Sequence, residues 1–140
     1  MSALESITER VNRNGHPDDP DTPRPLLTLA EFFEGNNVAG SICCNLFPCP
    51  EPHQVYEILG EIEQRDDVDV IYVQITAFDD PDWPFSDTVW VVTSAGSDEV
   101  ASWVPEEISP DEVWDNWIDS QPYESVSIPS GMQPIAIWWD

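Results

Sequence analysis

One stretch of the chain, residues 68–78, predicts a β-strand that is apolar on both of its faces. Val68, Val70 and Tyr72 point to one face of such a strand, and Ile71 and Val73 point to the other. A strand that can bury both faces is typical of the inside of a sheet, where it has a partner strand on each side. The fold must therefore provide a sheet around these residues.

Other segments carry clear signals for helices and strands. Thr28 and Glu31 form a capping-box pattern that starts a short helix, and Gly35 ends it. Residues 52–65 place apolar side chains at the i, i+3, i+4, i+7 spacing of an amphipathic helix. The remaining predictions are strands at 38–47, 88–93 and 135–139 and helices at 97–104 and 109–118.

The order of these elements predicts an α+β fold. After the first helix the order is strand, helix, two strands, helices and a final strand, which is the split βαβ pattern of ferredoxin-like folds. We expect a four-stranded, mostly antiparallel sheet with helices on one face and an extra N-terminal helix. Residues 1–24 are rich in Pro and Asp and predict a weakly structured arm, whereas residues 25–140 predict a single acidic domain.

The charge of the chain limits its partners. It has 28 acidic residues against four basic ones, all arginine, and a formal net charge of −24. Direct binding of nucleic acid or of an anionic membrane surface needs cations that this chain lacks. It also has no apolar run of the ~20 residues that span a bilayer, no apolar signal core and an odd number of cysteines. We therefore expect a cytoplasmic protein whose partner is basic.

A small group of thiols and imidazoles is a candidate metal or catalytic site. Cys43, Cys44, Cys49 and His53 lie within eleven residues, and such side chains are the preferred ligands of zinc. Adjacent cysteines in a strand point to opposite faces, however, and no paired C-x-x-C motif is present. We expect no metal and no cofactor. The alternative is a small metal-dependent or Cys/His-dependent enzyme that uses Cys49, His53 and nearby carboxylates, since His16 lies in the arm.

Acidic and aromatic residues together suggest a surface that binds a protein. Tryptophan is enriched at interface hot spots, and in a strand one of Trp138 and Trp139 must face away from the core. Four other tryptophans fall on apolar stripes that predict burial in the core: Trp90, Trp103, Trp114 and Trp117. The candidate partner-binding residues are Asp79, Asp80, Asp82, Trp83, Asp87, Asp111, Asp115, Asp119, Trp138 and Trp139.

In size, charge and overall make-up the chain resembles small acidic inhibitor proteins of bacteria. These include immunity proteins that neutralise nuclease or deaminase toxins, and phage proteins that mimic DNA. The segments that carry the resemblance are 27–35, 83–87 and 137–140. The resemblance implies a non-enzymatic protein that blocks a basic partner, and it assigns no role to individual residues. A domain whose charge serves only high-salt solubility is a further alternative.

Overall fold

The computed structural model describes residues 5, 9, 13, 26–36, 38, 41–43, 50–75, 86–115, 126 and 128–139. They form an α+β domain with an antiparallel sheet. Its elements are β1 (Leu26–Thr28), α2 (Leu29–Phe33), α3 (Pro52–Glu63), β2 (Val68–Gln74), β3 (Thr88–Thr93), α4 (Ser97–Trp103), the 3-10 helix η1 (Glu106–Ile108), β4 (Glu112–Asp115) and β5 (Gln133–Trp138).

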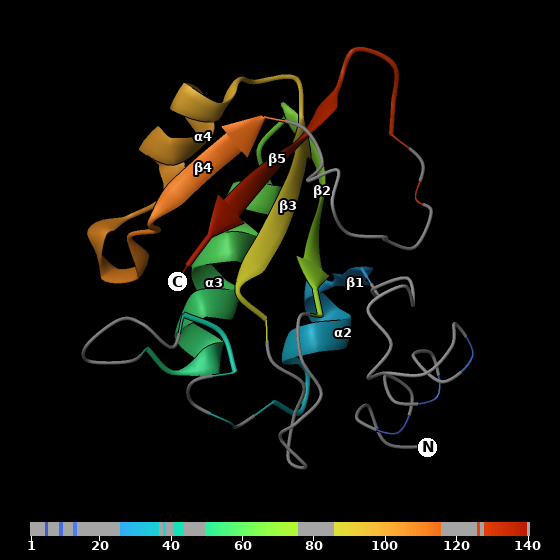
Figure 1. The fold of residues 1–140 in the computed structure, drawn as a ribbon, viewed down its shortest axis with the longest axis vertical. Coiled ribbons are helices and arrows are strands. Elements are labelled where there is room, and N and C mark those ends of the chain that lie inside the picture. The colour runs from blue at the N-terminus through green and yellow to red at the C-terminus, as the bar shows by residue number, and fades with distance from the viewer. Residues whose placement is uncertain are drawn as a thin grey trace.

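The sheet has five strands in the order β1-β2-β3-β5-β4, and each neighbouring pair is antiparallel. All six residues of β3 are buried, because this strand lies in the middle of the sheet. The inner strand predicted at residues 68–78 is confirmed over Val68–Gln74, since β2 lies between β1 and β3, and residues 76–78 lie outside the described part of the chain. Figure 1 shows the strands side by side, with β5 between β3 and β4.

The two faces of the sheet differ in what packs against them. α2, α3, α4 and η1 contribute buried residues to one large core that covers the first face, and Figure 1 shows α3 behind the sheet. The second face carries a smaller buried cluster of Leu26, Trp90 and Ala136, with Tyr72, Trp114 and Val126 packed against it. Trp90 donates its indole Nε1–H to Gln74 Oε1 at 3.0 Å within this cluster. Helices on one face were predicted, and the described residues confirm this.

α2 and α3 form where the sequence predicts helices. At α2 the Glu31 backbone N–H donates to Thr28 Oγ1 at 3.2 Å, and the Thr28 N–H donates to Glu31 Oε1 at 2.9 Å. This is the capping box that the sequence predicted. Along α3 the apolar stripe buries Val55, Leu59 and Ile62, so that the helix packs on the sheet.

The ferredoxin-like arrangement of four strands is not confirmed. In a ferredoxin-like fold each strand–helix–strand unit is split by another strand that lies between its two strands. Here β1 and β2, which α2 and α3 connect, are direct neighbours and antiparallel. The additional strands, β1 and β4, are three and four residues long. An alternation of apolar and polar residues is hard to recognise over so few positions.

The helix predicted at residues 109–118 was wrong where the structure describes it. Glu112–Asp115 form strand β4, which pairs with β5 in a register that sets Val113 opposite Ile137 and Trp114 opposite Ala136. In a strand, adjacent side chains face opposite sides. Val113 therefore packs on the large core of the helical face, and Trp114 packs on the smaller cluster of the other face. A helix could not separate the two side chains in this way.

The strand predicted at residues 38–47 was also wrong at Ser41–Cys43, which form a bend. Cys43 has φ 58°, in the left-handed region that a strand does not use. The bend is fixed by the Ser86 N–H, which donates to Ser41 O at 2.7 Å. Residues 39, 40 and 44–47 lie outside the described part of the chain.

Most of the proposed N-terminal arm lies outside the described residues. Glu5, Glu9 and Arg13 are described there, and all three are exposed. The division into an arm of residues 1–24 and a domain of residues 25–140 stays a prediction.

Candidate protein-binding site

Two tryptophans form a half-buried pair where β4 meets β5. The rings of Trp114 and Trp138 stack with centroids 5.3 Å apart and planes 28° apart. Both side chains lie on the sheet face that the helices do not cover, because Trp138 lies opposite Glu112, two residues from Trp114 on the same strand. Both are only partly buried, so the pair offers an aromatic surface at the side of the sheet.

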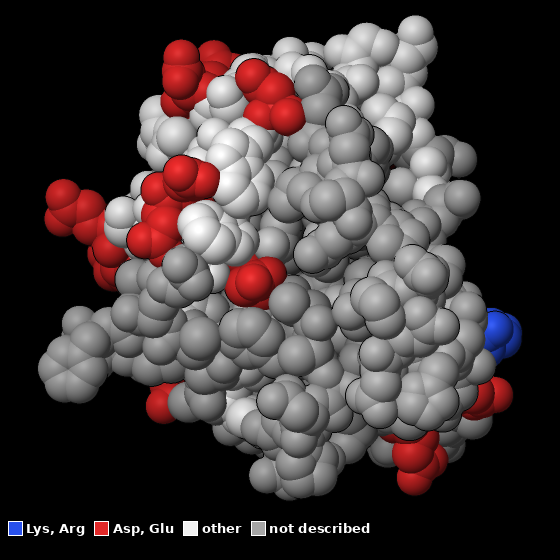
Figure 2. All heavy atoms as spheres, viewed as in Figure 1, with Lys and Arg blue, Asp and Glu red and all other residues white. Residues whose placement is uncertain are grey.

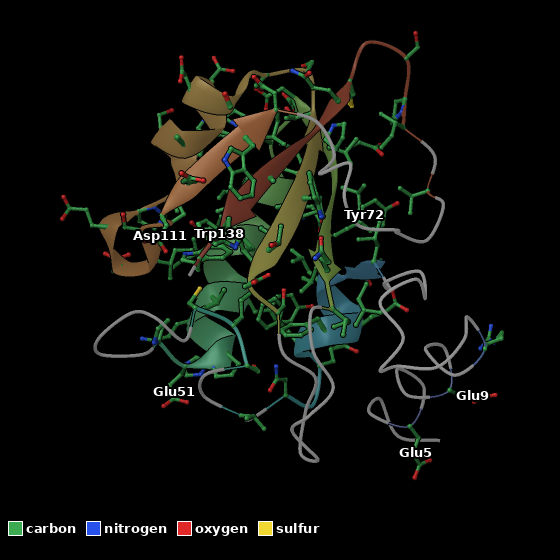
Figure 3. All side chains as sticks on the ribbon, viewed as in Figure 1. Glu5, Glu9, Glu51, Tyr72, Asp111 and Trp138 are labelled. Carbon is green, nitrogen blue, oxygen red and sulfur yellow. The ribbon has the colours of Figure 1, made fainter. Side chains whose placement is uncertain are left out.

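Carboxylates frame this aromatic pair. Glu112 lies directly opposite Trp138 in the β4–β5 register and is exposed. Asp111 is also exposed, and its backbone N–H donates to Trp138 O at 2.9 Å. Figure 3 shows Asp111 and Trp138 close together beside β4 and β5, whereas Tyr72 lies on β2, across β3 and β5 from them. We call Asp111, Glu112, Trp114 and Trp138 the β4 patch.

The β4 patch belongs to an acidic side of the molecule. Figure 2 shows Asp and Glu atoms gathered along the side that α4, η1 and β4 form. Exposed carboxylates on these elements are Asp98, Glu99, Glu106, Glu107, Asp111, Glu112 and Asp115. This side of the molecule therefore carries a negative electrostatic potential.

Asp115 has a structural contact that the sequence did not reveal. Its Oδ1 accepts a hydrogen bond from the Ser97 backbone N–H at 3.2 Å, in the first turn of α4. The first backbone N–H groups of a helix have no partner within the helix. Asp115, on strand β4, provides an acceptor for one of these groups in α4. Asp111 and Asp115 fall within the helix predicted at residues 109–118, but Asp115 belongs to strand β4.

Trp139 is a core residue, which corrects its place among the candidate binding residues. Its side chain is 1% exposed, and its Nε1–H donates to Ile108 O at 2.8 Å. The expectation that one of the two adjacent tryptophans faces away from the core is confirmed, and that residue is Trp138. A partner cannot reach the buried indole of Trp139 without unfolding this part of the domain.

The other acidic candidates are placed only in part. Asp87 is half-buried, and its Oδ1 accepts a hydrogen bond from Thr88 Oγ1 at 2.9 Å. Its carbonyl oxygen accepts one from the Trp139 N–H at 2.9 Å. Asp87 therefore joins β3 to the residue that follows β5. The remaining candidates lie outside the described residues: Asp79, Asp80, Asp82, Trp83 and Asp119.

The thiol and imidazole candidates do not meet in the described structure. Cys43 is fully buried, whereas His53 is exposed in the first turn of α3. Cys44, Cys49 and His16 lie outside the described residues. In the part of the chain that the structure describes, no three His, Cys, Asp or Glu side chains gather as metal ligands would.

The sequence predicted Trp114 on the buried face of a helix, whereas the structure shows it only partly buried on strand β4. Trp103 was also assigned to the core, but it is half-buried beneath Arg65, whose Cζ lies 4.0 Å from the ring centroid. The adjacent pair Val113 and Trp114 holds the relevant signal, since β-branched and aromatic residues favour strands. That signal spans too few residues to outweigh the helix-start pattern before it.

The described helices include none that is both long enough and apolar enough to cross a bilayer.

Comparison with known proteins gives a family for the chain. A family model described as "Uncharacterized protein YfbO family" matches residues 2–137. A protein of Escherichia coli (strain K12), "Uncharacterized protein YfbO", is 49% identical over 140 residues, which cover all of both chains. No solved structure matches the chain. The chain therefore belongs to the YfbO family.

Proposed function

We propose that this chain is a non-enzymatic cytoplasmic protein that binds and neutralises a basic partner. The partner we propose is a bacterial toxin of the nuclease or deaminase type. Such a toxin uses Arg and Lys side chains to hold its substrate, and an acidic binding protein can occupy those cations in the manner of a DNA mimic. The observation that carries the proposal is the β4 patch, a stacked tryptophan pair framed by exposed carboxylates.

The chemistry of the β4 patch suits such a partner. Aromatic side chains supply most of the energy at the centre of many interfaces, and charged rims set the orientation and speed of encounter. The large net charge of −24 adds a long-range attraction for a positively charged protein. Like charges across two copies of the chain repel, so the same surface disfavours self-association.

High-salt adaptation is the alternative that salt dependence distinguishes, because it requires a chain that is poorly folded at low salt and gains stability towards molar salt. The alternative of a metal-dependent or Cys/His-dependent enzyme depends on Cys49 and His53, and of these two the structure describes only His53. We therefore argue only the binding function further.

The experiment expresses the genes next to the one that encodes this chain, each alone and together with it. We expect one product to stop growth when it is expressed alone and growth to recover with the chain. Calorimetry on the purified pair should give an affinity that falls at least about tenfold between ~0.05 M and ~0.3 M NaCl, because salt screens exposed ion pairs.

Matched variants test the β4 patch itself. Trp138→Ala and Glu112→Lys should weaken binding and rescue, because they remove the aromatic contact and reverse a framing charge. Tyr72→Ala and Glu57→Lys are the controls. Tyr72 is half-buried on β2, on the same face of the sheet as Trp114, and Glu57 is exposed on α3. Equal effects of the patch variants and the controls would contradict the patch, and salt-independent binding would contradict the role of charge.

A further inference from the structure

A second acidic and apolar surface lies on the helical side of the domain. A groove of about 390 Å³ opens between α3 and the segment from the end of α4 to η1. Its apolar lining comes from Ile58 and Ile62 of α3 and from Trp103 and Pro105 across the groove. Ile58, Trp103 and Pro105 are only partly buried, so part of this lining meets solvent. We call it the α3–η1 groove.

One wall of the α3–η1 groove already holds a cation of the chain itself. The guanidinium of Arg65 lies over the Trp103 ring, with Cζ 4.0 Å from the ring centroid. Its Nε also lies 3.0 Å from Asp67 Oδ1, which compensates its charge. The wall is thus an aromatic surface on which a planar cation packs.

The remaining charges of the groove are negative. Glu61 of α3 and Glu107 of η1 line it, and both are exposed. Within the described part of the chain neither carboxylate has a salt-bridge partner, because Arg65 pairs with Asp67. The groove therefore combines an apolar floor with a net charge of about −2, counted as Glu61 and Glu107 with the Arg65–Asp67 pair neutral.

We propose that the α3–η1 groove is a docking site for a short basic peptide segment in which an aliphatic side chain is flanked by Arg or Lys. The aliphatic side chain packs on Ile58, Ile62 and Trp103, and the flanking cations pair with Glu61 and Glu107. A second copy of this acidic chain would be repelled from the same rim, and so would nucleic acid. The groove lies on the helical side of the sheet, so the proposal does not depend on the β4 patch.

The test uses a fluorescein-labelled peptide of the composition Gly-Lys-Arg-Leu-Arg-Lys-Gly and fluorescence anisotropy at 0.15 M NaCl. A second peptide carries Ser in place of Leu and keeps every charge. We expect the Leu peptide to bind and the Ser peptide to bind at least about fivefold more weakly, because the Ser side chain leaves the apolar floor uncovered. In NMR spectra of the full chain, the indole signal of Trp103 should shift on titration with the Leu peptide.

Charge-matched variants separate the groove from the general acidity of the chain. Glu61→Gln with Glu107→Gln should weaken binding of the Leu peptide roughly tenfold, through the loss of two ion pairs. Glu57→Gln with Glu106→Gln removes the same charge from exposed neighbours and should change the affinity less than about twofold. Trp138→Ala, which tests the β4 patch, should leave peptide binding unchanged. Equal weakening by both double variants, equal binding of the two peptides, or no binding of the Leu peptide would each overturn the proposal.

Discussion

Trp139 and Trp138 are adjacent in sequence but differ in what their indole rings contact. The Nε1–H of Trp139 donates to Ile108 O from a buried position, whereas Trp138 stacks on Trp114 at the surface. We expect Trp139→Phe to lower the free energy of unfolding by about 1–3 kcal/mol, since it leaves a buried carbonyl without its donor. Trp138→Phe should lower it by less than about 1 kcal/mol, because it keeps an aromatic ring and removes no buried hydrogen bond of this kind.

Urea denaturation followed by circular dichroism measures both free energies under one set of conditions. The two variants carry the same chemical change at neighbouring positions, so each serves as the control for the other. Equal losses would contradict the different burial of the two side chains.

At the scale of elements, α4 depends on a residue of β4 for its first turn. α4 has seven residues and follows Gly96, which has no side chain with which to cap it. Asp115 Oδ1 supplies the acceptor for the Ser97 N–H. Asp115→Ala should therefore lower the free energy of unfolding by about 1 kcal/mol, and Asp115→Asn, which keeps an acceptor oxygen, should lower it less.

Glu112→Ala is the matched control on the same strand, because Glu112 is exposed and frames the β4 patch. It should leave the unfolding midpoint within error and should reduce only partner binding. If Asp115→Ala were as stable as the parent chain, the contact between β4 and α4 would not contribute to stability.

The elements that the sequence predicted correctly are those with a long or strong pattern. α3 and β3 were predicted because an apolar stripe or a continuous apolar run extends over several turns or residues. β4 could not be predicted, because its four residues become a strand by pairing with β5, which follows 18 residues later in the chain. The candidate site suffered from the same limit. Alternation in the last strand predicted that one of Trp138 and Trp139 faces away from the core, but it did not say which. Trp114 joins Trp138 only once β4 and β5 pair.

At the scale of the whole molecule, the boundary of the domain can be tested by truncation. Leu26 and Leu27 of β1 are each 1% exposed, and β1 pairs with β2 along the edge of the sheet. Removal of residues 1–24 should leave the melting temperature within about 3 °C of the full chain. Removal of residues 1–28 should lower it far more, because the two buried leucines are lost. Calorimetry measures the melting temperature of both truncated chains. A large decrease on removal of residues 1–24 alone would show that the arm is part of the core.

The net charge of −24 predicts how the stability of the domain responds to salt. We expect a domain that is folded at ~0.01 M NaCl and whose free energy of unfolding rises by about 1 kcal/mol towards ~0.5 M, as screening shortens the reach of like-charge repulsion. The double variant Glu57→Gln with Glu61→Gln, which removes two exposed carboxylates one turn apart on α3, should show a smaller rise. An unfolded chain at low salt would instead favour the high-salt interpretation.

The position of β5 between β3 and β4 has a consequence for the order in which the sheet can assemble during synthesis. A nascent chain leaves the ribosome N-terminal end first, so β1, β2 and β3 can pair as they emerge. β4 emerges next but has no neighbour until residues 133–138 have followed it. Until then one side of β3 and both sides of β4 stay unpaired, and exposed strand edges are prone to pairing with other chains. Translation that stops before residue 133 would therefore yield an open sheet without the β4 patch, because Trp138 and the pairing partner of β4 would both be missing.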